Sequence, residues 1–257
     1  QEVPPVPNLA ALLKRPVPDN VYGTLARTFV PAELGRVVPA TENYVTHMPF
    51  VSKGTNYFLV LTDTKLYQVS DTLAKKRKVW DLKEIRSITG DDEHIVLTLV
   101  TRVGSDDVHQ EQKVLMGEQF PCQSFPFLFA NRSRVVWQQY LESKIVPAPE
   151  VYQCHFFVAY QETPKKKTGA CVVLSTAAVF VCTLKSGLPA AVKDRFAADK
   201  LTALAAVPGN DRAVRLTLGD ATPVCVAATA DERNALTYEL RRLVWDTRKV
   251  SLPVQNS

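Results

Sequence analysis

Most of the chain alternates short apolar runs with turn-forming residues, which is the pattern of β-strands joined by tight turns. In the first half, this pattern predicts strands near residues 45–52, 56–63, 65–70, 77–88, 94–101, 112–116 and 124–129. In the second half, it predicts strands near residues 151–160, 170–175, 178–183, 192–207, 213–218 and 223–228. Apolar residues at helical spacing follow each series, so the pattern predicts two units of consecutive strands, each ending in a helix.

Each predicted helix has one apolar face. In the first helix Asn131 is the expected N-cap, and the face consists of Val136, Trp137, Tyr140 and Leu141. In the second helix Thr229 and Glu232 have the spacing of a capping box, and the face consists of Leu236, Leu240, Leu243 and Val244. An offset of 100 residues superimposes the two faces, which predicts a second copy that is shorter just before its helix.

Two blocks of the first half recur in the second half in the same order, as expected of an internal repeat. Residues 61–69 match residues 174–182, with two apolar runs around a polar turn and an aromatic residue at the same place. Residues 82–92 match residues 201–211, with apolar residues at every third position before a Gly-x-Asp turn. The offset changes from 113 to 119 between the blocks, which predicts a six-residue loop insertion.

This order of elements resembles the pleckstrin-homology-like fold over residues 45–146 and 151–249. The resemblance implies a mainly β protein with two capping helices, built as two antiparallel β-barrels in tandem. Trp137 falls where that family often has a helix tryptophan, whereas Thr237, its counterpart at the offset of 100, departs from the pattern. Residues 146–150 (VPAPE) are then a short, stiff linker.

The regions outside these two units have other compositions. Residues 1–44 contain seven prolines and are predicted to be a Pro-rich extended N-terminal segment, and residues 250–257 are predicted to be a C-terminal tail. The chain starts with Gln and has no signal-peptide pattern, so we expect a piece of a longer protein. The 17 uncharged residues 168–184 are too few for a spanning helix and rich in β-branched residues, so two buried strands are predicted there.

Composition limits the kind of partner. With 46% hydrophobic residues, the chain can build one large core or two small ones. The net charge of +5 comes from residues 151–257, which hold 14 basic and 9 acidic residues. This surplus permits attraction to an anionic surface but is far below that of a dedicated nucleic-acid binder, so no nucleic-acid partner is expected. Five widely spaced cysteines without C-x-x-C indicate a reducing, cytoplasmic compartment.

No pattern of catalytic or metal-binding residues is present, so the chain is predicted to be no enzyme and to need no cofactor. Cys154 and His155 are adjacent on a predicted strand, so their side chains point to opposite faces and cannot work as nucleophile and base. Residues 90–94 (GDDEH) and 104–109 (GSDDVH) fit polar turns and lack the ligand spacing of a calcium loop or zinc site. Glycine-rich phosphate-binding and nucleophile motifs are absent.

Two basic clusters are the candidate contacts for an anionic surface. One consists of Lys165, Lys166 and Lys167 in the predicted first hairpin loop of the second unit, and the other of Lys75, Lys76, Arg77 and Lys78 before the fourth strand of the first unit. Pleckstrin-homology domains that bind phosphoinositides also have basic residues at alternate positions of strand two, which TNYFLVL and TGACVVL lack. Any lipid contact is therefore expected to be weak and non-selective.

Three interpretations of these clusters remain open: solvated loops that protect strand edges, attraction to an anionic membrane, and contact with an acidic protein. The sequence thus predicts a non-enzymatic interaction module of a larger eukaryotic protein. It would bind a protein partner in a cytoskeletal or membrane-apposed assembly, through a barrel's helix or an open sheet edge. The alternative is a peripheral membrane module that binds acidic lipid headgroups through residues 165–167.

Overall fold

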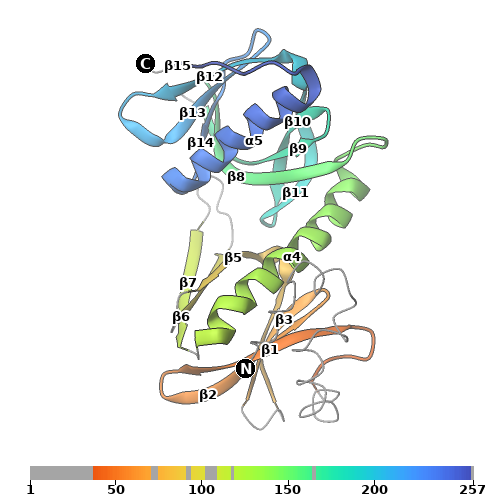
Figure 1. Ribbon diagram of the computed structural model, residues 1–257, viewed down its shortest axis with the longest axis vertical. Coiled ribbons are helices and arrows are strands. Elements are labelled where there is room, and N and C mark those ends of the chain that lie inside the picture. Colours follow the sequence, from red (N-terminus) through yellow and green to blue (C-terminus); the bar gives the residue numbers. More distant parts are fainter. Residues whose placement is uncertain are drawn as a thin grey trace, which may run out of the picture. The chain divides into compact units, whose positions relative to one another are not determined.

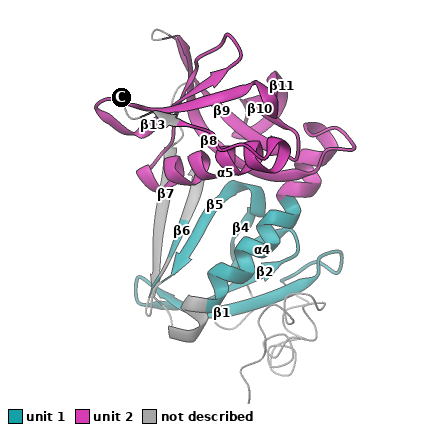
Figure 2. Cartoon of the chain, turned by 45° about the horizontal axis from the view of Figure 1, so that its top comes forward, with its two compact units in different colours: residues 1–99, 110–136 teal, residues 100–109, 137–257 magenta. Residues whose placement is uncertain are grey.

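The structure is a computed structural model that describes residues 37–70, 75–90, 94–101, 109–116, 119–163 and 166–255. The chain forms two compact units, residues 1–99 with 110–136 and residues 100–109 with 137–257 (Figure 2). The chain is mainly β with two long helices, so the predicted fold class is confirmed. The Pro-rich segment lies almost entirely outside the described residues, and the domain bounds at 146 and 151 stay predictions.

The first sheet has seven strands in the order β4-β3-β2-β1-β7-β6-β5. Most of these strands are labelled in Figure 1. They are β1 (Tyr44–Ser52), β2 (Thr55–Thr62), β3 (Lys65–Ser70), β4 (Lys76–Asp81), β5 (Ile85–Gly90), β6 (His94–Thr101) and β7 (His109–Met116). A short 3-10 helix, η2 (Leu82–Glu84), separates β4 from β5, where the sequence predicted one continuous strand. Helix α4 (Gln119–Lys144) follows the sheet.

The second sheet has the order β11-β10-β9-β8-β14-β13-β12-β15. Its strands are β8 (Tyr152–Thr163), β9 (Lys166–Ser175), β10 (Ala178–Lys185), β11 (Leu188–Ala197), β12 (Leu201–Val207), β13 (Asn210–Leu218), β14 (Val224–Val226) and β15 (Val254–Gln255). The 3-10 helix η3 (Ala198–Lys200) again interrupts a strand that was predicted to be continuous. Helix α5 (Ala230–Arg248) lies between β14 and β15 along the chain.

The two sheets agree in more than strand order. Leaving β15 aside, each has seven strands in the same sequence of neighbours, followed by a helix, as the pleckstrin-homology-like resemblance implies. Three irregularities of strand pairing also recur at equivalent places. The one at Tyr44/Thr46 in β1 matches Tyr152/Cys154 in β8, and the one at Gln68/Val69 in β3 matches Val181/Cys182 in β10. The one at Ile85/Ser87 in β5 matches Leu201/Ala203 in β12. Bulges bend strands at defined positions, so sharing them means that the two sheets share local shape as well as order.

One of the two predicted repeat alignments holds and the other is shifted. Tyr67 and Phe180 pair with Val60 and Val173, so the offset of 113 in the first block is right. In the second block, however, Ile85 is equivalent to Leu201 and not to Leu204. Ile85 directly follows η2 and pairs with β6, just as Leu201 directly follows η3 and pairs with β13. Apolar residues recur there at every third position, so a slip of three residues preserves the pattern.

The first helix begins earlier than predicted. Residues 124–129, predicted as a strand, are helical, and Asn131 lies inside helix α4 instead of capping it. Phe125 and Phe129 lie one turn apart and are buried in the core of the first unit with Leu59 and Leu97. The aromatic run FPFLF has high strand propensity, and packing of these two rings into the barrel overrides it. The offset of 100 between the helices is therefore wrong.

The predicted apolar face of that helix contributes to two clusters. Val136 packs against the core of the first unit, whereas Trp137 and Leu141 belong to a buried cluster of the second unit with Phe157 and Phe180. Trp137 is buried as predicted, but it lies against the second unit's sheet and not against the first barrel.

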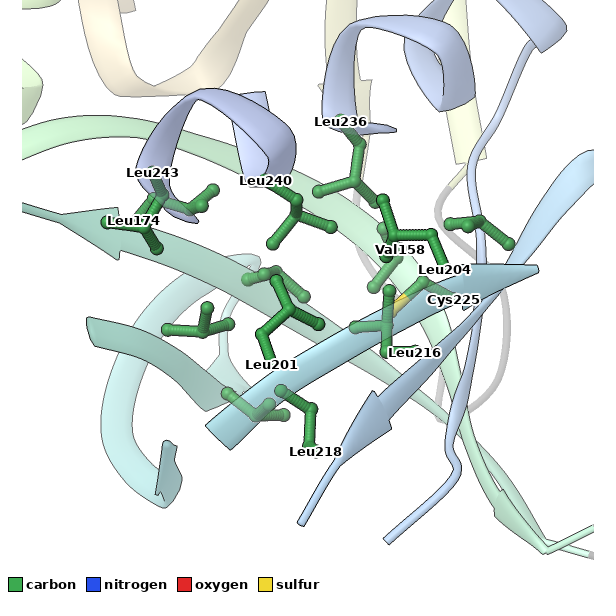
Figure 3. Close-up of a cluster of buried hydrophobic side chains, with 14 of the residues drawn as sticks. Val158, Leu174, Leu201, Leu204, Leu216, Leu218, Cys225, Leu236, Leu240 and Leu243 are labelled. Carbon is green, nitrogen blue, oxygen red and sulfur yellow. The ribbon is translucent and has the colours of Figure 1, made fainter. Parts of the chain in front are cut away.

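Helix α5 has the predicted N-cap Thr229 and the predicted buried face, but only the Thr229 half of the predicted capping box. The Glu232 N–H donates to Thr229 Oγ1 at 3.1 Å, and Glu232 Oε2 accepts from the Ala228 N–H at 3.1 Å, which satisfies N–H groups at the helix start. Leu236, Leu240 and Leu243 point from α5 into the core of the second unit, toward Leu201, Leu204 and Leu216 (Figure 3). The helix therefore covers one face of its own sheet.

Strands β8, β9 and β10 are buried on both faces over part of their length. Val158, Val172 and Val181 face the inner core with α5, while Phe157, Val173 and Phe180 face the cluster that contains Trp137 and Leu141. A strand without a solvent face cannot carry charge, which explains the uncharged run 168–184. No helix in the described part of the chain is long and apolar enough to cross a membrane.

Candidate interaction surfaces

The first basic cluster lies on an edge strand. Lys75 precedes β4, and Lys76, Arg77 and Lys78 are its first three residues, all exposed. The Lys76 Nζ lies 5.1 Å from the centre of the Tyr67 ring. Strand β4 ends the first sheet, and exposed lysines on an edge strand hinder pairing with other chains. This placement favours the interpretation that these residues protect the edge.

The second cluster is partly neutralised within its unit. Lys166 and Lys167 begin strand β9 instead of lying in a loop, and Lys165 lies outside the described residues. The Lys166 Nζ lies 3.0 Å from Glu162, and Glu162 also pairs with Lys193. Hydrogen bonds from Lys193 and Lys166 hold the pKa of the Glu162 carboxyl below its usual range. One carboxylate between two ammonium groups reduces the charge that remains for a lipid headgroup.

Changing Lys165, Lys166 and Lys167 together to Glu is expected to alter the free energy of unfolding by no more than about 0.5 kcal/mol, because exposed ion pairs contribute little. Chemical denaturation of the variant and its parent measures this. Lys193→Glu is the matched contrast, since Lys193 pairs with Glu162 and lies 5.3 Å from the Tyr160 ring centre. It should cost about 1 kcal/mol. A triple variant less stable than Lys193→Glu would contradict the surface role of the cluster.

The segment after α5 adds a strand to the second sheet. Lys249 has a left-handed backbone (φ 56°) that ends the helix and reverses the chain. Leu252 is 4% exposed and packs in the core, the Leu204 N–H donates to the Pro253 oxygen at 3.1 Å, and β15 runs parallel to β12. Within residues 250–257, which were predicted to be a C-terminal tail, residues 253–255 lie along the outer edge of β12.

In the first unit the equivalent edge belongs to β5. Both β5 and β12 follow a 3-10 helix and have a bulge at the same place, and Ile88 is the counterpart of Leu204. Among the described residues, no strand pairs with the outer edge of β5. The backbone groups of β5 on that side are thus a template for an added strand.

The described residues offer no catalytic grouping. The His155 ring packs at a tilt against Trp137 with ring centres 4.3 Å apart, and its Nδ1 lies 2.8 Å from the Tyr152 hydroxyl, while Cys154 packs against the inner core. Their opposite faces were predicted correctly. Burial raises the pKa of the Cys182 and Cys225 thiols to about 12, so neither is an activated nucleophile.

No group of three or more metal-ligating side chains occurs in the described part, and residues 91–93 and 104–108 of the two acidic turns lie outside it.

A largely buried carboxylate ties the start of each unit to its strands, to β2 and β3 in the first unit and to β9 and β11 in the second. The Tyr67 and Thr62 hydroxyls donate to Glu42 at 2.8 Å, and the Lys65 Nζ lies 2.9 Å from it. In the second unit Glu150 likewise accepts from the Ser175 hydroxyl and pairs with Arg195.

These two networks belong to a third repeated block, which was not among the predicted repeats. Residues 36–47 (RVVPATENYVTH) and 144–155 (KIVPAPEVYQCH) share six of twelve residues, including Glu42 and Glu150. The shared Tyr and His also contact each other, as Tyr44 with His47 and Tyr152 with His155, both at 2.8 Å. The block lies largely before the first predicted strand of each unit, so a comparison of the strand series does not reveal it. A search for short identities does, since six of twelve residues are the same.

No protein-family model matches the chain, and no curated protein matches it in sequence. Solved structures resemble parts of it. The hSac2 domain of the human phosphoinositide phosphatase Sac2 is 13% identical, with 48% of this chain and 87% of that chain covered (TM-score 0.36). The FERM and C-terminal domain complex of Drosophila Merlin is 16% identical (40% and 32% covered, TM-score 0.33). The linker-DH/PH domains of p115-RhoGEF are 10% identical (45% and 34% covered, TM-score 0.35). The chain spans about a third of the last two, and these likenesses assign it no function.

Proposed function

We propose that this chain is a non-enzymatic interaction module of a larger eukaryotic protein, which holds an extended segment of a protein partner at the open edge of a barrel. Its setting is the cytoplasm, in a cytoskeletal or membrane-apposed assembly. The observation that carries this proposal is β15, an extended segment that pairs with β12 while Leu252 enters the core beside it.

Strand addition suits the chemistry of this edge. Backbone hydrogen bonds supply affinity for any extended segment, and a pocket for one apolar side chain supplies selectivity. The second unit fills this place with residues 252–255, whereas no strand within the described ranges pairs with the equivalent edge of β5, which we propose takes a similar segment from another protein. The expected partner segment therefore has a branched apolar residue followed by proline, as in Leu252–Pro253.

The lysine-loop alternative is less well supported. Glu162 binds both Lys166 and Lys193, so the second cluster presents less free positive charge than its sequence suggests. A membrane role through residues 165–167 would also be non-selective, because no basic pair continues along the strand. The protein-binding reading needs neither of these charges.

A chain that ends at Val250 tests the strand-addition mode, because it leaves the edge of β12 open. It should bind a labelled peptide of residues 249–257 at least tenfold more tightly than a peptide with Leu252→Asp, as measured by fluorescence anisotropy. Partner capture from eukaryotic cytosol, with the same peptide as competitor, then identifies segments that use this edge. A shortened chain that keeps its fold and binds both peptides equally would contradict the proposal.

A further inference from the structure

Helix α5 has a second face that its barrel does not use. Its buried residues point into the core, and on the opposite side Tyr238 and Trp245 are 64% and 52% exposed. These two residues are seven positions apart, so they lie on one line along the helix, about 10 Å from each other. Large aromatic side chains left this exposed usually mark a contact surface.

Basic side chains accompany the two aromatic residues. At 100° per residue, Arg241 lies on the same side of the helix as Tyr238 and Trp245, and Arg248 lies at the border of that side, while Lys249 is the C-cap residue directly after Arg248. All three are exposed, and Val250, just beyond the helix, is 49% exposed. Arg248 Nη1 donates to the backbone carbonyl oxygen of Asp199 at 3.4 Å, which partly fixes the position of the Arg248 side chain.

Acidic residues of α5 avoid the C-terminal half of this face. Asp246 lies to one side of it, and Glu239 pairs with Arg242 at 2.8 Å on that same side. Asp231 shares the face but lies near the start of the helix, about two turns before Tyr238. The face from Tyr238 to Lys249 therefore combines two aromatic side chains with a local excess of positive charge.

We propose that this face of α5 lies in the interface of a membrane that contains anionic lipid. Tyr and Trp have apolar bodies and polar tips, and both favour the level of the lipid headgroups. Arg and Lys beside them are attracted to anionic headgroups, by about fivefold in affinity for each cation. The side chains project from one convex helix, and the two cavities described beside α5 lie off this face, lined by Arg233 and by Arg242 with Asp246. The headgroup region of a membrane can deform around such projecting side chains, whereas a protein partner would need a complementary groove.

The test uses the full chain with phosphatidylcholine vesicles, with or without phosphatidylserine, at low salt. Co-sedimentation is expected only with phosphatidylserine, and it should weaken as salt rises. The tryptophan emission should shift to the blue, and brominated lipid should quench it. Trp245 accounts for this response, because Trp137 is 4% exposed and Trp80 is half-buried.

Two variants and a control locate the contact. Tyr238→Ala with Trp245→Ala should weaken vesicle binding at least tenfold, and Arg241→Glu with Lys249→Glu should do the same, with the fold unchanged in circular dichroism. Lys166→Glu with Lys167→Glu is the matched charge control and should keep most of the binding. The chain ending at Val250 should also keep it, which separates this proposal from the strand-addition site.

Several outcomes would overturn the proposal. Absence of binding to phosphatidylserine vesicles at low salt would do so, and so would binding that survives the aromatic variant but is lost in the Lys166 and Lys167 control. If vesicles fail to bind while Trp245→Ala abolishes capture of a purified partner, the face is a protein contact instead.

Discussion

A Trp137→Ala protein is expected to lose about 3–5 kcal/mol of unfolding free energy, which is the usual cost of truncating a buried tryptophan. Trp137 is 4% exposed, and its ring lies 4.3 Å from His155 and 5.9 Å from Phe157 between ring centres. Removing the indole leaves a cavity on the outer side of β8, β9 and β10, which are already packed on their inner side. Chemical denaturation of the variant and its parent measures the loss.

The location of the destabilisation in Trp137→Ala is as informative as the loss of unfolding free energy. Because Trp137 packs in the second unit, hydrogen exchange should accelerate in β8, β9 and β10, while amides of β1 to β3 keep their protection. Trp245→Ala is the matched control, since Trp245 is exposed, and it should change stability by no more than about 0.5 kcal/mol. If protection falls in the first unit instead, the assignment of this part of α4 to the second unit is wrong.

The parts of the fold that followed from sequence are those with local signals. Alternating polarity and turn residues marked most strands, and the Thr229 and Glu232 capping box marked the start of α5 almost to the residue. These features depend on neighbours a few positions away, so one sequence is enough to detect them.

The errors arose where distant packing decides. Phe125 and Phe129 are helical because both rings fill the core of the first unit, although their local preference is for strand. Likewise, Trp137 and Val136 are adjacent in sequence and serve different clusters, which no helical periodicity reveals. A face assigned from spacing alone does not say which sheet it covers.

The candidate surfaces show the same limit. The lysines at 165–167 could be seen in the sequence, but the ion pairs of Glu162 with Lys166 and Lys193 require β8, β9 and β11 to come together. Strand β15 was missed because two paired residues carry no periodicity. The exposed pair Tyr238 and Trp245 could have been found by counting around α5, since the buried stripe was already known.

Replacing Glu42 by Ala is expected to destabilise the first unit by about 3 kcal/mol, because it leaves two donors without their carboxylate. The Tyr67 and Thr62 hydroxyls each donate to Glu42 at 2.8 Å, and the side chain of Glu42 is 7% exposed. Glu42→Gln keeps the size and one acceptor oxygen, so it should cost about half as much. Exchange of the exposed Glu84 for Ala serves as a control in the same unit, although it also removes the capping contact to Asp81 at 3.1 Å.

The pH dependence of these variants distinguishes the carboxylate from mere packing. Burial raises the pKa of Glu42, but hydrogen bonds from Lys65, Tyr67 and Thr62 outweigh it, so the pKa in the folded protein lies below 4.5. A carboxyl with a lowered pKa stabilises the fold above its unfolded pKa, and this contribution is lost as the pH falls through the folded value. The stability gap between the parent and Glu42→Gln should therefore be constant from pH 6 to 7 and narrow below about pH 4.5. A gap that stays constant down to pH 3 would show that the charge of Glu42 contributes nothing to the network.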